Sequence, residues 1–295
     1  MDQKELRAWI GRTETRTDQV TPTPIAALAA TFDRRDPFPE TGDPLPPLWH
    51  WLYFLPIHRA SELGPDGHAE RGGFIPPVQL PRRMFAGGRY WFHRPLRVGE
   101  TVARHSSIVD VNRKDGRRGP LVFVLVRHEI SGADGVAVVE EHDIVYRSGP
   151  APGVPAPSNA ERGTGNGEHG TPVQQTPNDA AWRLEVAPND VLLFRYSALT
   201  FNGHRIHYDR RYATEVEGYP GLVVHGPLIA TLLLELLRTN LPAAVVAEFS
   251  CRAVRPIFDV APFSVCGRQD TSTSVRLWAA DAEGAPAMHA TATLA

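Results

Sequence analysis

Residues 220–237 read PGLVVHGPLIATLLLELL, and this stretch decides the fold of the chain. Because proline suits the first turn of a helix, the run predicts a helix over 225–239. The polar residues Thr231, Glu235 and Arg238 form one narrow stripe, and apolar residues fill the rest of its surface. A helix that is apolar on most sides must be covered by other elements. Since long predicted strands follow it, we expect an antiparallel sheet curled around a central helix.

The same order of elements occurs twice along the chain. Arg94-Pro95-Leu96 and Arg255-Pro256-Ile257 each follow a predicted strand, and a predicted hairpin follows each motif. The hairpins join 121–130 to 136–146 in the first half and 275–279 to 288–294 in the second. This repetition predicts a duplicated unit. The short aromatic stretch PPLWHWLYF at 46–54 is the poorer counterpart of the helix, so we expect the helix of the first copy to be degenerate.

The stretch 148–178, SGPAPGVPAPSNAERGTGNGEHGTPVQQTPN, separates the two halves. It is rich in proline, glycine, serine and asparagine and has almost no large apolar residue. Such a segment cannot bury enough surface to fold on its own. We therefore predict a flexible linker at 148–178 between an N-terminal unit, 1–147, and a C-terminal unit, 179–295.

The composition narrows the class of protein. The 295 residues carry a formal net charge of -2 and are 42% hydrophobic, which is typical of a soluble globular protein. Nucleic-acid and anionic-membrane partners are not expected, because they require a basic excess. Two cysteines, Cys251 and Cys266, make no disulfide framework. The first residues, MDQKELRAWIG, lack the apolar core of a signal peptide, so we expect a cytoplasmic protein.

The chemistry is concentrated in YSALTFNGHRIHYD, residues 196–209, directly ahead of the helix. His207 is the natural general acid or base, because its ordinary pKa lies closest to neutral pH. The amide of Asn202 can orient a water but cannot exchange protons. The free N–H at Gly226, at the positive end of the helix dipole, offers a site for a developing oxyanion. This combination suggests either addition of water beside a polarised carbonyl or attack on that carbonyl.

Other roles for these polar residues remain open at this point. His204, His207, Asp209 and His225 are conceivable metal ligands, but an H-x-x-H spacing does not fit one regular helical face, and we expect no metal. Asp209 could fix the ring of His207 or simply cap a helix. Arg205 could pair with a surface carboxylate or bind an acidic group of a substrate.

The segment resembles the hydratase segment of the MaoC-like, hydroxyacyl-thioester dehydratase type 2 group of hot-dog-fold proteins. The resemblance continues in PLPPLWHWLYFLP (44–56), RGGFIPPVQLPRRMFAGGRYWFHRPLRVGE (71–100) and EEHDIVYR (140–147), which look like the mesaconyl-C4-CoA hydratases of this group. It implies an α+β double hot-dog: two fused units, each an antiparallel sheet wrapped around a helix, with a degenerate N-terminal helix.

The resemblance also implies an activity and a set of site residues. The reaction is the reversible hydration of an α,β-unsaturated acyl-CoA, with mesaconyl-C4-CoA giving citramalyl-CoA as the first expectation. The catalytic residues are then Asn202, His207 and Gly226, with Asn202 standing where enoyl hydratases of the group carry an aspartate. The expected substrate-binding residues are Arg205, Tyr208, His225, Val224, Arg82 and Arg83. His50 is one further candidate cation for a substrate carboxylate.

The implied chemistry needs no cofactor, because CoA enters as part of the substrate. The oligomeric state stays open between monomer and homodimer. Within the same class, an itaconyl-CoA hydratase or a dehydratase of another 3-hydroxyacyl thioester is the alternative. Outside it, an acyl-CoA thioesterase would need a carboxylate to activate water, and Asn202 argues against this. A non-catalytic acyl-thioester binding protein is the last alternative.

Overall fold

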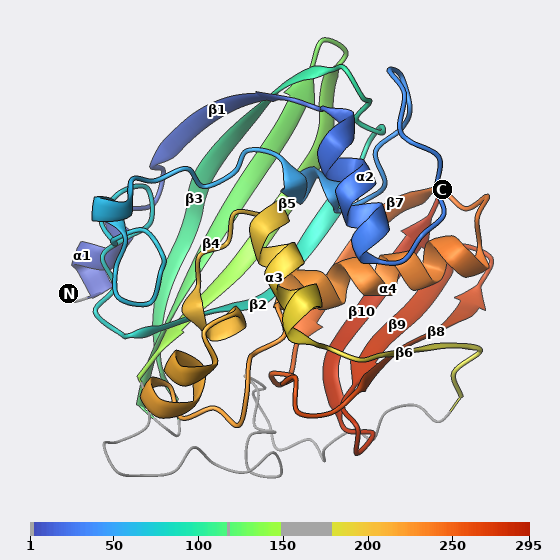
Figure 1. Ribbon diagram of the computed structural model, residues 1–295. Coiled ribbons are helices and arrows are strands. Elements are labelled where there is room, and N and C mark those ends of the chain that lie inside the picture. Colours follow the sequence, from blue (N-terminus) through green and yellow to red (C-terminus); the bar gives the residue numbers. More distant parts are fainter. Residues whose placement is uncertain (1–2, 117–118, 149–178) are drawn as a thin grey trace. The chain divides into compact units, whose positions relative to one another are not determined.

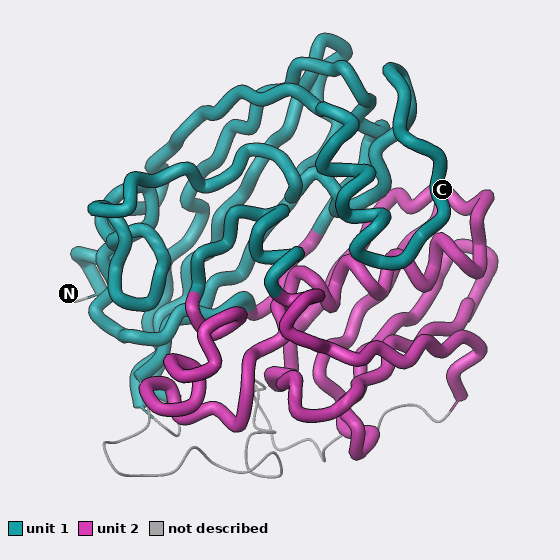
Figure 2. Tube along the Cα trace, in the orientation of Figure 1, with its two compact units in different colours: residues 1–85, 90–149, 194–204 teal, residues 86–89, 150–193, 205–295 magenta. Residues whose placement is uncertain are grey.

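The computed structural model describes residues 3–116, 119–148 and 179–295 (Figure 1). The chain separates into two compact units (Figure 2). Unit 1 comprises residues 1–85, 90–149 and 194–204, and unit 2 comprises residues 86–89, 150–193 and 205–295. Of the predicted linker, residues 149–178 lie outside the described residues. The linker and the domain bounds drawn from it therefore stay predictions.

Unit 1 is built on a sheet with the strand order β1-β3-β4-β5-β2. The pairs β1–β3, β3–β4 and β4–β5 are antiparallel. The described elements, in chain order, are α1 (Gln3–Arg7), β1 (Thr13–Gln19), α2 (Pro22–Thr31), the 3-10 turns η1 (Trp49–Leu52) and η2 (Ala60–Glu62), β2 (Arg82–Phe92), β3 (Thr101–Gly116), β4 (Gly119–Gly132) and β5 (Gly135–Arg147). The predicted first hairpin is confirmed as β4–β5.

Unit 2 repeats this arrangement with the strand order β7-β10-β9-β8-β6. All four neighbouring pairs are antiparallel. The elements are β6 (Trp182–Val186), α3 (Asp190–Leu199, which continues into unit 1), the 3-10 turn η4 (Arg205–His207), the π-helical turn η5 (Tyr212–Val216), α4 (Gly226–Asn240), β7 (Val246–Ala253), β8 (Phe263–Thr271), β9 (Ser274–Ala280) and β10 (Pro286–Leu294). The predicted second hairpin is confirmed as β9–β10.

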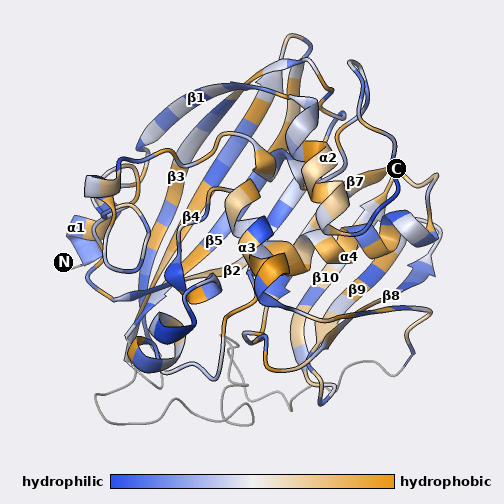
Figure 3. Ribbon diagram, viewed as in Figure 1, coloured by the Kyte–Doolittle hydropathy of each residue, from blue (hydrophilic) through white to orange (hydrophobic). Residues whose placement is uncertain are grey.

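The central helix of unit 2 is the predicted one. Helix α4 packs on β6, β8, β9 and β10, and Figure 3 shows that most of its residues are hydrophobic. All residues from Leu228 to Leu237 are buried, Thr231 and Glu235 included. The Thr231 hydroxyl donates to the Pro227 carbonyl (2.9 Å), which satisfies it inside the helix. In the described part of the chain, no helix has the length and apolarity needed to cross a membrane.

The predicted duplication is visible in matching hydrogen bonds. Leu45 donates its N–H to Leu96 (2.7 Å) in unit 1, and Val224 donates to Ile257 (2.9 Å) in unit 2. The N–H groups of Val254 and Arg255 converge on the carbonyl of Ala287. In unit 1, the N–H groups of His93 and Arg94 converge in the same way on the carbonyl of Ala137. These bonds align the two copies residue by residue.

The alignment also shows how the first copy has degenerated. Because Leu45 corresponds to Val224, the next residues Pro46 and Pro47 correspond to His225 and Gly226. Proline has no N–H, so unit 1 lacks the helix-opening donor that Gly226 provides. The four-turn helix α4 is replaced there by a single 3-10 turn, η1. The expected degenerate N-terminal helix is confirmed, and the aromatic side chain of Trp49 is buried in the core.

Candidate active site

His207 is held by backbone groups of unit 2. It ends the 3-10 turn η4, and its side chain is buried. The turn is attached to Val223 by two bonds: Val223 donates its N–H to Ile206 (2.9 Å), and the Val223 carbonyl lies 2.7 Å from Nδ1 of His207. A carbonyl oxygen can only accept, so Nδ1 carries a proton. In the neutral ring Nε2 then holds the lone pair, which is the form that a general base requires.

His225 fixes the plane of the His207 ring. The two imidazoles are stacked with ring centroids 3.7 Å apart and an interplanar angle of 17°. His225 is fully buried and is the N-cap of α4. Its extended backbone conformation turns the chain into the helix, and the next residue is Gly226. The stack therefore brings His207 to the N-terminal end of α4.

The N-terminus of α4 offers hydrogen-bond donors. The first intrahelical bond of this turn runs from the N–H of Ile229 to the carbonyl of His225 (3.1 Å). The N–H groups of Gly226 and Leu228 precede it and have no carbonyl to bond within the helix. Pro227, between them, has no N–H group. The positive end of the helix dipole adds to their attraction for an oxyanion. A base and an anion-stabilising site thus belong to one unit.

Arg205 and Asp209 form an ion pair on the same segment. The Arg205 guanidinium binds the Asp209 carboxylate through Nε (3.0 Å) and a terminal nitrogen (2.7 Å), and it lies over the Tyr212 ring. The Tyr212 N–H and this guanidinium lower the pKa of Asp209. Of the roles left open above, these contacts favour a structural one for both residues, since they brace the turn that carries His207.

Asn202 belongs to unit 1 and closes a tight turn. Its side-chain oxygen accepts the N–H of His204 (3.0 Å), and its own N–H donates to the Ser197 carbonyl (2.8 Å). His204 is buried, and its ring contacts that of His68 with ring centroids 4.1 Å apart and an interplanar angle of 42°. His204 therefore groups with a loop of unit 1. The assignment of Asn202 to water binding rests on the sequence and stays a prediction.

The other predicted substrate-binding residues lie in different surroundings. Val224 is buried, and its N–H is bonded to Ile257. Tyr208 is exposed, at 45% of its surface. Arg82 and Arg83 begin strand β2 of unit 1 and are half-buried. His50, named as a candidate cation, donates instead to the buried carboxylate of Glu140 (2.8 Å).

Sequence reasoning missed two polar clusters of unit 1. One joins Asp66 and His68 to His204, with ligand-capable atoms of the three residues within 4.8 Å of one another. The other surrounds the Glu140 carboxylate with His50, Trp51, His128 and His142. The signal for the first was present in the sequence GPDGHAERGG at 64–73, where acidic and imidazole side chains stand between glycines. The second is scattered over three elements and has no local signal.

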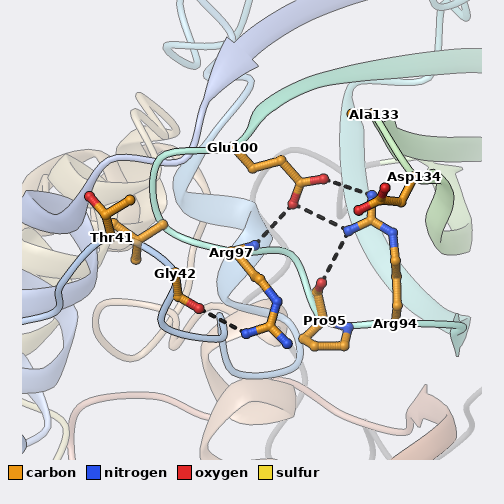
Figure 4. Close-up of a pocket in the computed structure, with 9 residues that line it drawn as sticks. Thr41, Gly42, Arg94, Pro95, Arg97, Glu100, Ala133 and Asp134 are labelled. Atoms are coloured by element: carbon orange, nitrogen blue, oxygen red, sulfur yellow. Dashed lines mark hydrogen bonds and ion pairs between the residues drawn. The ribbon is translucent and has the colours of Figure 1, made fainter.

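A surface hollow on unit 1 contains none of the predicted site residues (Figure 4). It is lined mainly by the first Arg-Pro motif and the turn before β3. Arg94 binds Glu100 (2.7 Å), and Arg97 donates to the carbonyl of Gly42 (2.8 Å). The hollow therefore lies at the repeated motif and not at the predicted site.

Comparison with known proteins identifies the family of the chain. Residues 48–259 match the family described as hydroxyacyl-thioester dehydratase type 2. The chain is 48% identical over 294 residues to the mesaconyl-C(4)-CoA hydratase of Chloroflexus aurantiacus, covering 100% of this chain and 99% of that protein.

The fold comparisons agree as well. The solved structure of HtdX from Mycobacterium tuberculosis covers 95% of this chain and 99% of its own, with 19% identity and a TM-score of 0.60. Another M. tuberculosis protein, described as a double hotdog fold, has 14% identity and a TM-score of 0.58, with 97% of this chain and 96% of that one covered. The expected α+β double hot-dog is confirmed. The chain therefore belongs to the hydroxyacyl-thioester dehydratase type 2 family of hydro-lyases.

Proposed function

We propose that this hydro-lyase adds water to the C=C bond of mesaconyl-C4-CoA to give citramalyl-CoA, with His207 as the acid–base group. The observation that carries the proposal is the His207 ring itself. Its Nδ1 is bound to the Val223 carbonyl, and its plane is stacked on His225, the N-cap of α4. The 48% identity over the full chain to a mesaconyl-C(4)-CoA hydratase supports the choice of substrate.

The reaction can be written with these groups alone. The thioester carbonyl accepts a hydrogen bond from the Gly226 N–H, which draws electrons from the conjugated C=C bond. His207 Nε2 takes a proton from water, and the water oxygen bonds to C3. The π electrons move toward the carbonyl as an enolate, which the helix N-terminus stabilises. The imidazolium then returns its proton to Cα, so that one water is added and the ring is neutral again.

Asn202 is assigned the task of holding the water. It stands five residues before His207 in the sequence, and its amide oxygen can accept a hydrogen bond from water without exchanging a proton. The proposed chemistry calls for no metal or redox cofactor, and CoA is part of the substrate. We also propose a cytoplasmic enzyme without nucleic-acid or membrane partners. A homodimer is compatible with the proposal and is not required by it.

A thioesterase is the rival from another reaction class, and the ion pair on this segment argues against it. Hydrolysis of a thioester in this fold would use a carboxylate to activate water. Asp209 is the carboxylate nearest to His207 in the sequence. It is bound by Arg205 and by the Tyr212 N–H, which fix it in a bracing role.

The test is to incubate the purified protein with mesaconyl-C4-CoA, itaconyl-CoA and crotonyl-CoA and to follow each product by mass. The proposal predicts the gain of one water on mesaconyl-C4-CoA at the highest rate. Faster hydration of itaconyl-CoA would move the assignment to that substrate. Release of free CoA thiol, detected with a colour reagent, would indicate a thioesterase. No change in any of the three thioesters would leave only acyl-thioester binding.

A further inference from the structure

Two guanidinium groups and one carboxylate come together in unit 1 beside His204. Arg71 donates to the carbonyls of Leu80 (2.5 Å) and Pro81 (2.6 Å), and also to that of Val78. Neutral carbonyls fix its position but leave its charge uncompensated. The carboxylate of the group is Asp66, which is bound to Nδ1 of His68 (3.1 Å).

Arg83 is the second guanidinium, and the Tyr146 hydroxyl lies against it. Among the described residues, no carboxylate oxygen lies within 4 Å of Arg83. The Tyr146 side chain is fully buried, and its hydroxyl has no hydrogen bond of normal geometry within the described part of the chain. Because a guanidinium only donates, the hydroxyl proton of Tyr146 has no acceptor there. Within the described residues, the Tyr146 hydroxyl proton therefore lacks an acceptor and Arg83 lacks a carboxylate partner.

The net charge of the group around His68 is also positive. Burial and the nearby charge of Arg83 lower the pKa of His68 to about 4, so the ring is neutral at pH 7. With Arg71, Arg83 and Asp66 ionised, the group carries one excess positive charge. A metal cation does not suit it, although Asp66, His68 and His204 could reach one ion. An anion with two acceptor oxygens would remove the excess charge.

The loop that carries His68 is packed against the hydratase segment. A Cβ on Gly203 would lie 2.7 Å from the Gly67 carbonyl, so the two backbones touch at a position that only glycine permits. The ring of His68 contacts that of His204, which is three residues before His207 in the chain. The positive group is thus attached to the segment that leads into the acid–base residue.

We propose that Arg83, with the hydroxyl of Tyr146, binds the free carboxylate of a dicarboxylic acyl-CoA substrate. The inference rests on the proposed function and goes beyond it, because it assigns the recognition of the second carboxylate to named groups of unit 1. Arg205 is not needed for this task, since its guanidinium is paired with Asp209. His50 is not needed either, since it is bonded to Glu140.

The experiment compares kcat/KM for mesaconyl-C4-CoA, which has the carboxylate, with that for crotonyl-CoA, which lacks it. Hydrogen bonds to a charged group contribute about 1.5–3 kcal/mol, so Arg83→Gln should lower kcat/KM for the first substrate by roughly 10- to 100-fold. Crotonyl-CoA should change by less than about threefold, within the spread expected when no bond is lost. Arg83→Lys should recover part of the loss, because it restores the charge without the planar fork.

Two matched variants separate recognition from structure. Tyr146→Phe removes only the hydroxyl and should lower the ratio of the two kcat/KM values in the same direction by a smaller factor. Arg113→Gln removes an exposed arginine from strand β3 of the same unit and should leave the ratio unchanged. Equal losses on both substrates in Arg83→Gln, or an unchanged ratio, would overturn the proposal while leaving the hydratase assignment intact.

If Arg83→Gln does not fold, the same question can be asked of the wild-type enzyme with a modified substrate. The methyl ester of mesaconyl-C4-CoA has the same carbon skeleton without the charge. The proposal predicts a loss in kcat/KM of the same size as in Arg83→Gln, and an ester hydrated as well as the acid would overturn it. If the enzyme hydrates neither, calorimetric binding of the acid and the ester tests the subsite separately from the reaction. Equal affinities would then reject the subsite.

Discussion

The two copies of the repeated unit differ most at one pair of aligned residues. Unit 2 has His225 and Gly226 at the start of a long helix, whereas unit 1 has Pro46 and Pro47 before a single 3-10 turn. The backbone around both pairs is held by matching hydrogen bonds, so the difference is chemical and not topological. Replacing a glycine N–H with a proline nitrogen removes the donor on which an oxyanion site depends. Loss of that donor confines the proposed oxyanion site to unit 2.

The cores of the two units also differ in chemistry at aligned positions. In unit 2 the residues Ile229, Leu277, Ala290 and Ala292 make an apolar core. The aligned residues of unit 1 are His50, His128, Glu140 and His142, the last three placed by the strand pairing of β4 and β5. Glu140 is buried and accepts from His50 (2.8 Å) and Trp51 (3.0 Å). A copy without the central helix has thus filled its core with a hydrogen-bonded polar network.

Gly226→Pro would place a proline in unit 2 at the position where unit 1 has Pro47. Proline is tolerated at the first helical position, and His225 already has the extended backbone (ψ 129) that a following proline requires. The helix should therefore persist while the N–H is lost. Because removal of one oxyanion donor costs about 10²–10³ in kcat, we expect a loss of that size in steady-state kinetics.

Gly226→Ala is the control for this variant, since it keeps the N–H and adds a methyl group. It should retain most of the activity. If Gly226→Pro keeps a native circular dichroism spectrum and also keeps its kcat, the N–H has no part in the reaction, and the contrast between the two copies loses its functional meaning.

Glu140→Ala tests the polar network of unit 1. It leaves the ring donors of His50 and Trp51 without their acceptor, and breaking a buried ionic group in this way costs about 3–5 kcal/mol. We expect a loss of that size in the free energy of unfolding, measured by denaturant titration. A loss below about 1 kcal/mol, the scale of an exposed ion pair, would show that the network does not hold this core together.

A fourfold variant asks whether the network can be exchanged for the core of unit 2. It combines His50→Ile, His128→Leu, Glu140→Ala and His142→Ala. Replacing a complete buried ionic group by apolar residues is often neutral or stabilising, whereas removing one partner is not. The fourfold variant should therefore unfold at a higher denaturant concentration than Glu140→Ala alone. The opposite order would mean that the two cores are not interchangeable.

The pH dependence of stability gives the smallest effect. Burial lowers the pKa of His128 to about 3, from an ordinary value of 6.5. Between these values the unfolded chain binds a proton that the folded chain does not, so stability falls as the pH is lowered from 6.5. His128→Leu should reduce this slope by about 1.4 kcal/mol per pH unit. Measured between pH 6 and 4.5, above the ordinary pKa of the Glu140 carboxyl, the difference isolates the histidine. Parallel stability curves for the two proteins would contradict the assignment.

The sequence predicted the elements whose pattern is strong within one segment. The central helix, both hairpins and the repeated Arg-Pro motif follow from apolar runs and turns that can be read locally. Strand β1, TETRTDQ, has no such signal, because it is a polar edge strand defined by its pairing with β3. Helix α2, PTPIAALAAT, was missed because prolines stand at both ends of its first turn.

The candidate site was predictable to a similar extent. His207 and Gly226 stand in a short segment next to a helix start, where titratable groups and glycine are conspicuous. The contacts of His207 with Val223 and His225 could not be foreseen, because they depend on how the turn η4 folds back onto the strand-like segment before α4. The grouping of His68, Arg83 and Tyr146 required the tertiary structure, since a loop and two strands supply them.

The central claim is that unit 2 carries the acid–base group, and His207→Ala tests it most directly. General acid–base catalysis contributes about 10²–10⁴-fold, so kcat for mesaconyl-C4-CoA should fall by at least about 100-fold with the fold intact. His105→Ala, at an exposed histidine of strand β3, serves as the matched control and should retain full activity. A loss of less than about tenfold in His207→Ala would contradict the account, because it is below the range of this catalysis.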